Sequence, residues 1–350
     1  MTTASQGQDV MRVLVTGASG MLGRSVAEAL VARGDQVTVL QRRPAGIDGA
    51  GEILGSIDDE SAVARAVSGQ DAVIHLAAKV TMTGDLEEFE RVNIHGTRSL
   101  LGAARQAGVT RFVHLSTPSV AHTGSSIVGE GAGPADPFGT RGPYARTKAA
   151  AEIEALGADS AGFSVVAIRP HIVWGPGDTQ LVQRVVDRAS AGRLPILGSG
   201  AALVDTTYVD DAVSAIVAAV DRAEAPEVHG RAFVVSGGDP RPIADILSAW
   251  CEAAGVRPPS RRLPPALAKA AGSAVEGLWT VLPERLTSRL SDDGVPPMTR
   301  FLAEQLSTAH WFDIRRTRKA LDWEPQIGFE AGTAALARAY RRQHRMLRAR

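Results

Sequence analysis

The sequence predicts an α/β fold in which a doubly wound parallel sheet is followed by a smaller C-terminal domain. Two observations carry this prediction: short apolar runs alternate with helix-length segments up to residue 170, and Gly, Pro and Asp residues break the rhythm just after it. Parallel strands need helical crossovers because no tight turn can join them. We therefore expect a first domain over residues 10–178 and a second, mainly substrate-binding domain over 179–350, with parts of 204–255 returning to the first.

Apolar periodicity places the individual elements. In the first half we expect strands at residues 10–15, 36–40, 52–54, 72–76, 111–115 and 165–169, and helices at 21–31, 58–67, 86–106 and 144–156. In the second half we expect short strands at 203–209 and 232–235, and a helix at 266–282 with one apolar face. The polar residues 1–9 are expected to form a disordered leader.

Composition limits the classes of function. The 350 residues contain 38 Lys and Arg against 38 Asp and Glu, so no overall charge draws the protein to nucleic acid. Cys251 is the only cysteine, which excludes an internal disulfide, and the leader lacks the apolar core of a signal peptide. No apolar run approaches the roughly 18 residues of a membrane span. We expect a cytoplasmic protein that binds no nucleic acid and does not cross a membrane.

A glycine-rich loop, Gly17-Ala18-Ser19-Gly20-Met21-Leu22-Gly23, follows the first expected strand and opens the first expected helix. Glycine lets the backbone turn tightly and approach a pyrophosphate, while the amides of the helix N-terminus point at the anion. The sequence therefore predicts a Rossmann-type dinucleotide site, with a purely structural glycine turn as the alternative. The residues predicted to bind are Gly17, Ser19, Gly20, Met21, Leu22 and Gly23. Their spacing resembles that of the extended short-chain dehydrogenase/reductase family.

The end of the second strand bears on the choice between the two nicotinamide cofactors. An acid there accepts hydrogen bonds from the ribose 2′-hydroxyl, whereas arginine neutralises a 2′-phosphate. Here Leu40 is followed by Gln41, Arg42 and Arg43. We therefore predict NADP(H) as the cofactor, bound by Arg42 and Arg43; the alternative is that both arginines are solvated surface residues.

Tyr144 and Lys148 stand four residues apart in one expected helix, in a chain with only three tyrosines. Residues at this spacing share a helix face, so the Lys148 ammonium is expected near the Tyr144 phenol, where it favours the ionised form. A tyrosine tuned in this way serves as a general acid or base. The pair resembles the YxxxK signature of the same family; an exposed structural pair is the alternative.

The resemblance assigns roles to further residues. Thr117, after the fifth strand, aligns best with the catalytic Ser/Thr of the family, with Ser116 second, and its hydroxyl is expected to hydrogen-bond the substrate carbonyl. Lys148 is expected to hold the cofactor ribose. The resemblance also implies one structural asparagine, Asn93. The remaining cofactor contacts that it implies are Ile57, where relatives often have an aspartate, and Ala77, Ala78, Pro170 and Ile172. A metal site is not expected, because His75, His114 and His171 have no spaced partner.

The second half narrows the resemblance to one branch of the family. Residues 169–178 (RPHIVWGPGD) and 204–210 (VDTTYVD) look like the 3-beta-hydroxysteroid and sterol-4-carboxylate 3-dehydrogenase branch. Within that branch, residues 116–120 (STPSV) and 297–306 (PMTRFLAEQL) look most like the bacterial 2-alkyl-3-oxoalkanoate reductases of the olefin and beta-lactone pathway. This resemblance implies that NADPH reduces a hydrophobic beta-keto acid with two long alkyl chains to the beta-hydroxy acid.

Four other functions stay open. A 3-beta-hydroxysteroid or sterol dehydrogenase would share the same catalytic residues. A nucleotide-sugar dehydratase would carry Asp-Glu where Pro118 and Ser119 stand, and an epimerase usually has an acid where Gln41 stands. An NADP-sensing regulator, which is not an enzyme, would not need the Tyr144 and Lys148 pair.

The expected partner is a hydrophobic small-molecule substrate. Residues 266–306 are expected to cover its alkyl chains, because prolines bracket their helix, and the Trp174 region is expected to line them; ordinary core packing is the alternative for both. We expect a homo-oligomer. A complex with enzymes of the same pathway and a peripheral membrane contact, for which the arginine-rich tail at 336–350 is a candidate, stay open.

Overall fold

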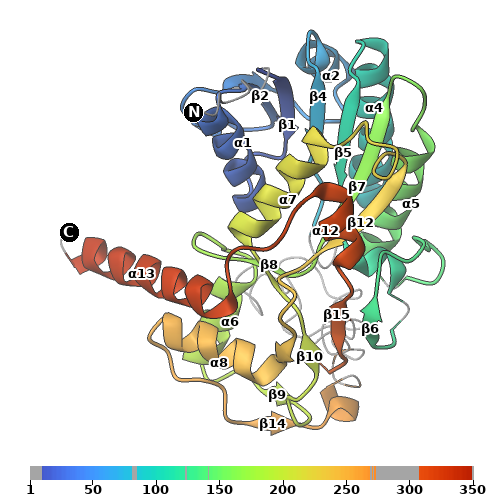
Figure 1. Cartoon of the computed structure of the whole chain (residues 1–350). Helices are drawn as coiled ribbons and strands as arrows, with labels where there is room; N and C mark the ends of the chain where they lie inside the picture. The colour runs from blue at the N-terminus through green and yellow to red at the C-terminus, as the bar shows by residue number, and fades with distance from the viewer. Residues whose placement is uncertain are drawn as a thin grey trace, which may run out of the picture.

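The computed structural model describes residues 10–80, 85–122, 124–140, 142–268, 270, 272 and 307–348. The leader expected at 1–9, most of the helix expected at 266–282 and the stretch 297–306 lie outside the described residues. Figure 1 shows one large sheet with helices on both faces and, below it, a group of short strands and helices from the second half.

The large sheet contains seven parallel strands in the order β12-β7-β5-β4-β1-β2-β3. Its strands are β1 (Arg12–Thr16), β2 (Gln36–Gln41), β3 (Gly51–Leu54), β4 (Ala72–His75), β5 (Arg111–Leu115), β7 (Ser164–Pro170) and β12 (Arg231–Val235). The chain winds from β1 outward through β2 and β3, then returns to β4 and winds the other way. This confirms the predicted Rossmann-type doubly wound sheet.

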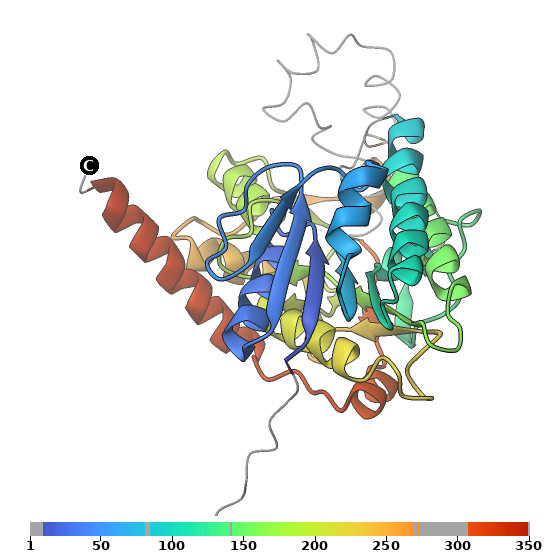
Figure 2. The ribbon, with the colours of Figure 1, turned by 90° about the horizontal axis from the view of Figure 1, so that it is seen from above.

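Helices cover both faces of this sheet because its strands carry apolar side chains on both. Val13 and Val15 of β1 belong to one buried cluster and Leu14 to the other, as the period of two along a strand requires. The first face is covered by α1 (Met21–Arg33) and α7 (Val209–Asp221), and the second by α2 (Glu60–Val67), α4 (Gly96–Gln106) and α5 (Pro143–Gly157). Figure 2 shows the two helical layers from above.

The helix expected at 86–106 is one continuous helical segment with a change of winding inside it. It runs through α3 (Leu86–Phe89), a π-helical turn η1 (Glu90–His95) and α4. The sequence predicted the extent but not the π-helical turn, which is a feature often found at functional sites. Asn93 lies in this turn.

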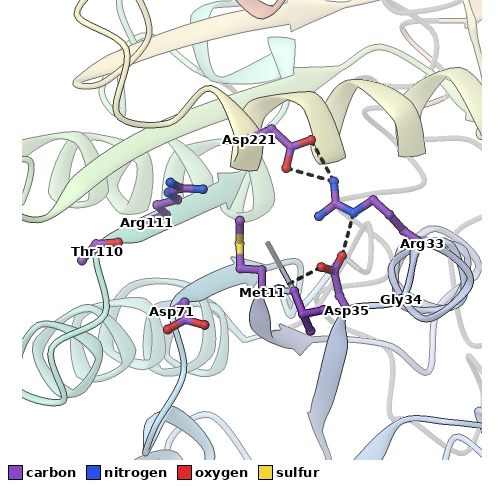
Figure 3. Close-up of a pocket in the computed structure, with 9 residues that line it drawn as sticks. Met11, Arg33, Gly34, Asp35, Asp71, Thr110, Arg111 and Asp221 are labelled. Atoms are coloured by element: carbon purple, nitrogen blue, oxygen red, sulfur yellow. Dashed lines mark hydrogen bonds and ion pairs between the residues drawn. The ribbon is translucent and has the colours of Figure 1, made fainter. Parts of the chain in front are cut away.

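Part of the second half returns to the large sheet. Strand β12 pairs with β7, and α7 packs against α1. Arg33, at the end of α1, donates hydrogen bonds to Asp35 at 2.7 Å and to Asp221, at the end of α7, at 2.8 Å. Figure 3 shows Arg33 between the two carboxylates. These contacts tie elements almost 190 residues apart into one layer.

The remaining second-half elements form three small sheets and their helices, with β6 and η2 contributed by the first half. They are η2 (Pro118–Ala121), β6 (Ile127–Glu130), β8 (Val173–Trp174), α6 (Val182–Ser190), β9 (Ile196–Leu197), β10 (Leu203–Val204), β11 (Thr207–Tyr208), β13 (Arg241–Pro242), α8 (Ile243–Ala253), β14 (Arg262–Leu263), β15 (His310–Phe312), α12 (Arg315–Leu321) and α13 (Phe329–Arg348).

The single strand expected at 203–209 is wrong. The segment forms β10, breaks at Asp205, forms β11 in a different sheet and enters α7 at Val209. Asp205 causes the break, because its buried carboxylate accepts hydrogen bonds from the Ser236 hydroxyl at 2.7 Å and the Gly238 amide at 3.0 Å. These bonds are to a distant loop and are invisible in the local apolar pattern.

Trp174 is a core residue. Its indole is 1% exposed, packs edge-on against Tyr208 and lies beside the rings of Trp250 and Phe329. The expectation that the Trp174 region lines the substrate is therefore wrong for this side chain.

From the same core, α13 projects away from the body of the molecule, as Figures 1 and 2 show. No helix within the described ranges is long and apolar enough to cross a membrane.

Candidate active site

The candidate site lies where the winding of the large sheet reverses. Strands β1 and β4 are neighbours, and the loops that follow them meet at Gly17 and Ala77. Gly17 has a φ of +79°, and a Cβ placed on it would lie 2.7 Å from the Ala77 amide nitrogen. In open α/β sheets, ligands bind in the crevice at such a reversal point, outside the carboxyl ends of the strands.

The glycines of the loop differ in the space beside them. A Cβ on Gly23 would lie 2.3 Å from the Gly17 carbonyl oxygen, so this glycine closes the loop on itself. A Cβ on Gly20 would meet its nearest atom at 3.7 Å, and Gly20 is exposed at the start of α1, where no side chain caps the helix. The first amides of α1 therefore face an open space, which fits a dinucleotide pyrophosphate. Ser19 is exposed and Met21 and Leu22 are partly buried beside it.

Arg42 and Arg43 follow β2 and are exposed. Within the described residues, neither makes a hydrogen bond or an ion pair. Sequence reasoning missed Glu52 of the adjacent strand, whose carboxylate accepts from the Gln41 side chain and from the Ala45 amide, both at 2.7 Å. An acid therefore lies beside Gln41, but its carboxylate already accepts hydrogen bonds from the protein itself. Only the pairing of β2 with β3 brings it there.

The other predicted adenosine-side residues differ in their placement. Ala77 and Ala78 are partly buried just after β4, and the Ala77 amide donates to the Thr16 hydroxyl at 3.1 Å. Ile57 is buried, and a Cβ on Gly96 would lie 2.7 Å from its side chain. The Ile57 side chain thus packs into the core under α4, so a cofactor contact at this position would have to use its backbone.

Asn93 connects the loop after β4 to the helix that carries Tyr144. Its side-chain oxygen accepts from the Lys79 amide at 2.7 Å, and its amide donates to the Thr147 hydroxyl at 3.0 Å. Thr147 lies in α5 between Tyr144 and Lys148. A buried asparagine with these partners fixes the distance between the two halves of the site.

Tyr144 and Thr117 meet at the carboxyl edge of the sheet. Tyr144 lies in the first turn of α5, which begins with Pro143 after Gly142 at a φ of +83°. The Tyr144 phenol and the Thr117 hydroxyl share a hydrogen bond, and Thr117 also accepts from the Ser119 amide at 3.3 Å. Ser116 is buried and its hydroxyl has no partner among the described residues. The structure therefore brings Thr117, rather than Ser116, to Tyr144.

Lys148 does not act on Tyr144 as the sequence predicted. Its ammonium donates to the Leu115 carbonyl and lies 3.3 Å from Nε2 of His114, both in β5. Burial raises the pKa of Tyr144 to about 12, opposed only by the Thr117 hydrogen bond. Burial also lowers the pKa of Lys148 to about 8, while Glu152 raises it. The expected effect of Lys148 on the phenol is therefore not found, because α5 directs the ammonium toward β5.

Pro170 and Ile172 lie just beyond Thr117 along the same edge of the sheet, where β7 ends. Ile172 has a φ of +46°, which is a strained conformation for a β-branched residue. Thr207 holds this backbone in place, because its amide donates to the Ile172 carbonyl at 3.1 Å and its hydroxyl donates to the His171 carbonyl at 2.7 Å. Strain maintained in this way is typical of functional sites.

The buried histidines are occupied by structural contacts. His75 hydrogen-bonds the Thr16 and Thr97 hydroxyls at 2.8 and 2.9 Å, and His171 hydrogen-bonds the Asp205 carbonyl at 2.5 Å. Within the described ranges, no group of three or more His, Cys, Asp or Glu side chains is placed to hold a metal ion.

The pocket in Figure 3 lies at the opposite edge of the sheet, near the amino ends of β1, β4 and β5. Its charges are paired: Asp71 with Arg12 at 2.6 Å, Arg111 with Glu224 at 2.9 Å, and Arg33 as described above. It offers no unpaired charge to a ligand and is not the candidate site.

A glycine cradle at the reversal point, next to a helix that presents Tyr144 and Lys148 beside a strand-end hydroxyl, defines an oxidoreductase of the extended short-chain dehydrogenase/reductase class. The particular family follows from comparison with known proteins. The chain belongs to the NAD dependent epimerase/dehydratase family, whose model matches residues 13–236.

Curated relatives extend the similarity to nearly the whole chain. A 2-alkyl-3-oxoalkanoate reductase of Stenotrophomonas maltophilia is 38% identical over 333 residues, covering 93% of this chain and 98% of the relative. A protein of the same name from Shewanella oneidensis is 32% identical, covering 93% and 86%. A 3-beta-hydroxysteroid dehydrogenase of Mycolicibacterium neoaurum is 30% identical, covering 93% and 90%.

Among solved structures, MoeE5 in complex with UDP-glucose and NAD superposes with a TM-score of 0.72 and 24% identity, covering 95% of this chain and 99% of that protein. At this level of identity, the likeness establishes the shared fold.

Proposed function

We propose that this protein reduces a hydrophobic beta-keto acid, a 2-alkyl-3-oxoalkanoate, to the beta-hydroxy acid with NADPH. The observation that carries the proposal is the 38% identity to a 2-alkyl-3-oxoalkanoate reductase over almost the full length of both chains. The arrangement of Tyr144, Thr117 and Lys148 supports ketone reduction as the chemistry.

The dinucleotide would lie along the carboxyl edge of the sheet. Gly20 and the first amides of α1 would hold the pyrophosphate, and the exposed, unpaired guanidinium groups of Arg42 and Arg43 would take the 2′-phosphate. Bound NADPH supplies the hydride for the ketone carbon.

The protein supplies the proton. With a pKa raised to about 12, the Tyr144 phenol is protonated at neutral pH and gives its proton to the oxygen as the ketone accepts hydride. Thr117, which shares a hydrogen bond with that phenol, donates to the same oxygen and stabilises its developing charge. Lys148, held against β5, would hold the cofactor ribose.

The substrate side of the proposal rests on residues beyond 178. The cover expected at 266–306 lies almost entirely outside the described residues. Of its described part, Ala268 is buried beside Leu197, whereas Leu267 is 59% exposed.

A second candidate function is oxidation of a 3-beta-hydroxysteroid or sterol. The similarity to a 3-beta-hydroxysteroid dehydrogenase at 30% identity supports it, because the catalytic residues would be shared. The two candidates differ in the shape of the apolar group beside the reacting carbon and in the direction of the reaction. In the oxidation, Tyr144 would accept the hydroxyl proton, whereas in the reduction it donates a proton.

The experiment that separates them is NADPH oxidation across a panel of long-chain beta-keto acids, ketosteroids and nucleotide sugars, with Tyr144→Phe as the inactive control. Turnover that rises with alkyl chain length supports the proposal. Turnover confined to ketosteroids favours the second candidate, and turnover of nucleotide sugars alone refutes both.

A further inference from the structure

Strand β5 anchors Lys148. Its ammonium donates one hydrogen bond to the Leu115 carbonyl, and Nε2 of His114 lies 3.3 Å from the same nitrogen. His114 is fully buried in the middle of the sheet, where its ring lies 5.6 Å from that of His75. A buried imidazole in contact with a functional ammonium needs an explanation beyond packing.

The contact fixes which nitrogen of His114 carries the proton. An ammonium group has only donors, so Nε2 must accept and therefore carries no proton. The proton of the neutral ring then lies on Nδ1, which has no hydrogen-bond partner among the described residues. Burial, together with the positive charge of Lys148, lowers the pKa of His114 well below its usual value, so the ring stays neutral. The protein therefore leaves one buried donor unpaired and keeps the acceptor for Lys148.

We propose that His114 is a positioning residue that, with the Leu115 carbonyl, holds two of the three Lys148 ammonium protons and leaves the third directed at the cofactor ribose. The part that concerns the ribose rests on the proposed function. The hydrogen bond to His114 also stabilises the charged form of Lys148 in a buried position, because an acceptor replaces the water that burial removed.

Three other titratable side chains near Lys148 bear on its protonation state: Glu152, Tyr144 and His75. Glu152 lies one turn further along α5 and raises the pKa of Lys148, but its carboxylate is itself paired with Arg169 of β7. Tyr144 lies one turn earlier on α5 and is neutral at pH 7. His75 of β4 is also neutral there, since burial and Lys148 lower its pKa to about 3. His114 is thus the side-chain acceptor from β5, beside the Leu115 carbonyl, and its removal is expected to make Lys148 lose its proton more readily.

Two substitutions distinguish the effect of the hydrogen-bond acceptor on His114 from the effect of the size of its ring. In His114→Gln, the side-chain oxygen reaches the place of Nε2 and accepts from Lys148. In His114→Asn, the shorter side chain reaches only the place of Nδ1, so polarity is kept but the acceptor is lost. The readout is the dissociation constant of NADPH between pH 6 and 9, measured by nucleotide fluorescence with no substrate present.

We expect binding by the parent to weaken with a midpoint near the Lys148 pKa of about 8. In His114→Asn the midpoint should fall by about one pH unit, the effect of losing one charge-assisted hydrogen bond, so the dissociation constant should rise about twofold at pH 7 and about tenfold at pH 9. His114→Gln should restore both. Identical profiles for Asn, Gln and parent would overturn the proposal, whereas a parent that binds neither NADPH nor NADH would refute the proposed function instead.

A measurement on the unsubstituted protein keeps the inference testable if a variant does not fold. In a sample labelled with 15N at histidine, two-bond correlations reveal the tautomer of each ring, and the signal missing from His114→Gln or any folded His114 variant identifies His114. The ring protons close to His75 offer a second route to the assignment. We expect His114 to be the Nδ1–H tautomer. An Nε2–H tautomer would overturn the proposal, because that nitrogen would then be unable to accept from Lys148.

Discussion

The Tyr144 phenol and the Thr117 hydroxyl share a hydrogen bond at the carboxyl edge of the sheet, although one begins a helix and the other follows a strand 27 positions earlier. Thr117 is kept in place by a second contact, to the Ser119 amide. This contact is the geometric basis for proposing Tyr144 as the proton donor and Thr117 as its partner.

Replacing Tyr144 with phenylalanine should abolish turnover and leave dinucleotide binding nearly unchanged. The ring still packs, and only the transferable proton and its hydrogen bond to Thr117 are lost. We expect kcat to fall by roughly 100-fold or more, as for other general acids, with the NADPH dissociation constant within about threefold of the parent. Steady-state kinetics beside a fluorescence titration measures both. Activity within about tenfold of the parent would remove Tyr144 from the acid role.

The glycine loop offers a matched pair of substitutions. Gly20→Ala has room in the protein, with a φ of −85° and the nearest atom at 3.7 Å, but its methyl group occupies the approach of the pyrophosphate. We expect a folded protein whose NADPH affinity falls at least about tenfold. Gly23→Ala forces a Cβ to 2.3 Å from the Gly17 carbonyl and should instead lower the free energy of unfolding by about 1–3 kcal/mol. Unchanged affinity in Gly20→Ala would argue against a pyrophosphate at this position.

Arg42→Ala should weaken NADPH much more than NADH. The Arg42 guanidinium is exposed and unpaired within the described chain, so its loss disturbs no internal contact. Because it is expected to pair with the 2′-phosphate, KM should rise about tenfold or more for NADPH and little for NADH. Parallel kinetics with both cofactors tests this, and an equal loss for the two would contradict a phosphate contact.

The buried ion pair of Glu152 and Arg169 should be necessary for stability. The two side chains are 1% and 2% exposed, and Arg169 also donates to the Gly133 carbonyl at 2.7 Å. Glu152→Gln leaves the guanidinium buried with its charge uncompensated, so the free energy of unfolding should fall by about 3–5 kcal/mol. Glu154→Gln on the same helix is the control, since its partner Arg98 is 63% exposed and the loss should stay below about 1 kcal/mol. Urea unfolding that finds equal losses would contradict the assignment.

The buried histidines should make the protein sensitive to mild acid. Burial lowers the pKa of His75 and of His310 to about 3 and that of His171 to about 4. The unfolded chain binds these protons near pH 6.5 and the folded protein does not, so stability is full above pH 6.5 and falls as the pH drops toward 4. Each group contributes a slope of about 1.4 kcal/mol per pH unit in that window.

Urea unfolding at pH 7, 6 and 5 measures this slope. His310→Asn should reduce this slope by about 1.4 kcal/mol per pH unit, which corresponds to one proton, because the side chain that gains a proton on unfolding has been removed. A free energy of unfolding that stays constant from pH 7 to 5 would show that the histidines are already charged in the fold.

The sequence by itself determined what depends on local spacing. Apolar periodicity located the first-half strands of the large sheet and the helices that cover it, but not η2 or β6. The position of Gly17, Gly20 and Gly23 between a strand and a helix located the glycine loop. The interval of four residues placed Tyr144 and Lys148 on one helix face. Backbone geometry over a few residues determines these features, so they can be predicted from the sequence without knowledge of the fold.

Only the tertiary structure decided which distant groups meet. The pairing of β2 with β3 sets Glu52 beside Gln41, the packing of α5 on β5 turns Lys148 toward His114 rather than Tyr144, and the bonds from Asp205 split one apolar run into β10 and β11. Each depends on the register or rotation of elements that are far apart in the chain. Local propensity contains no term for such contacts, because their energy exists only once the elements have packed together.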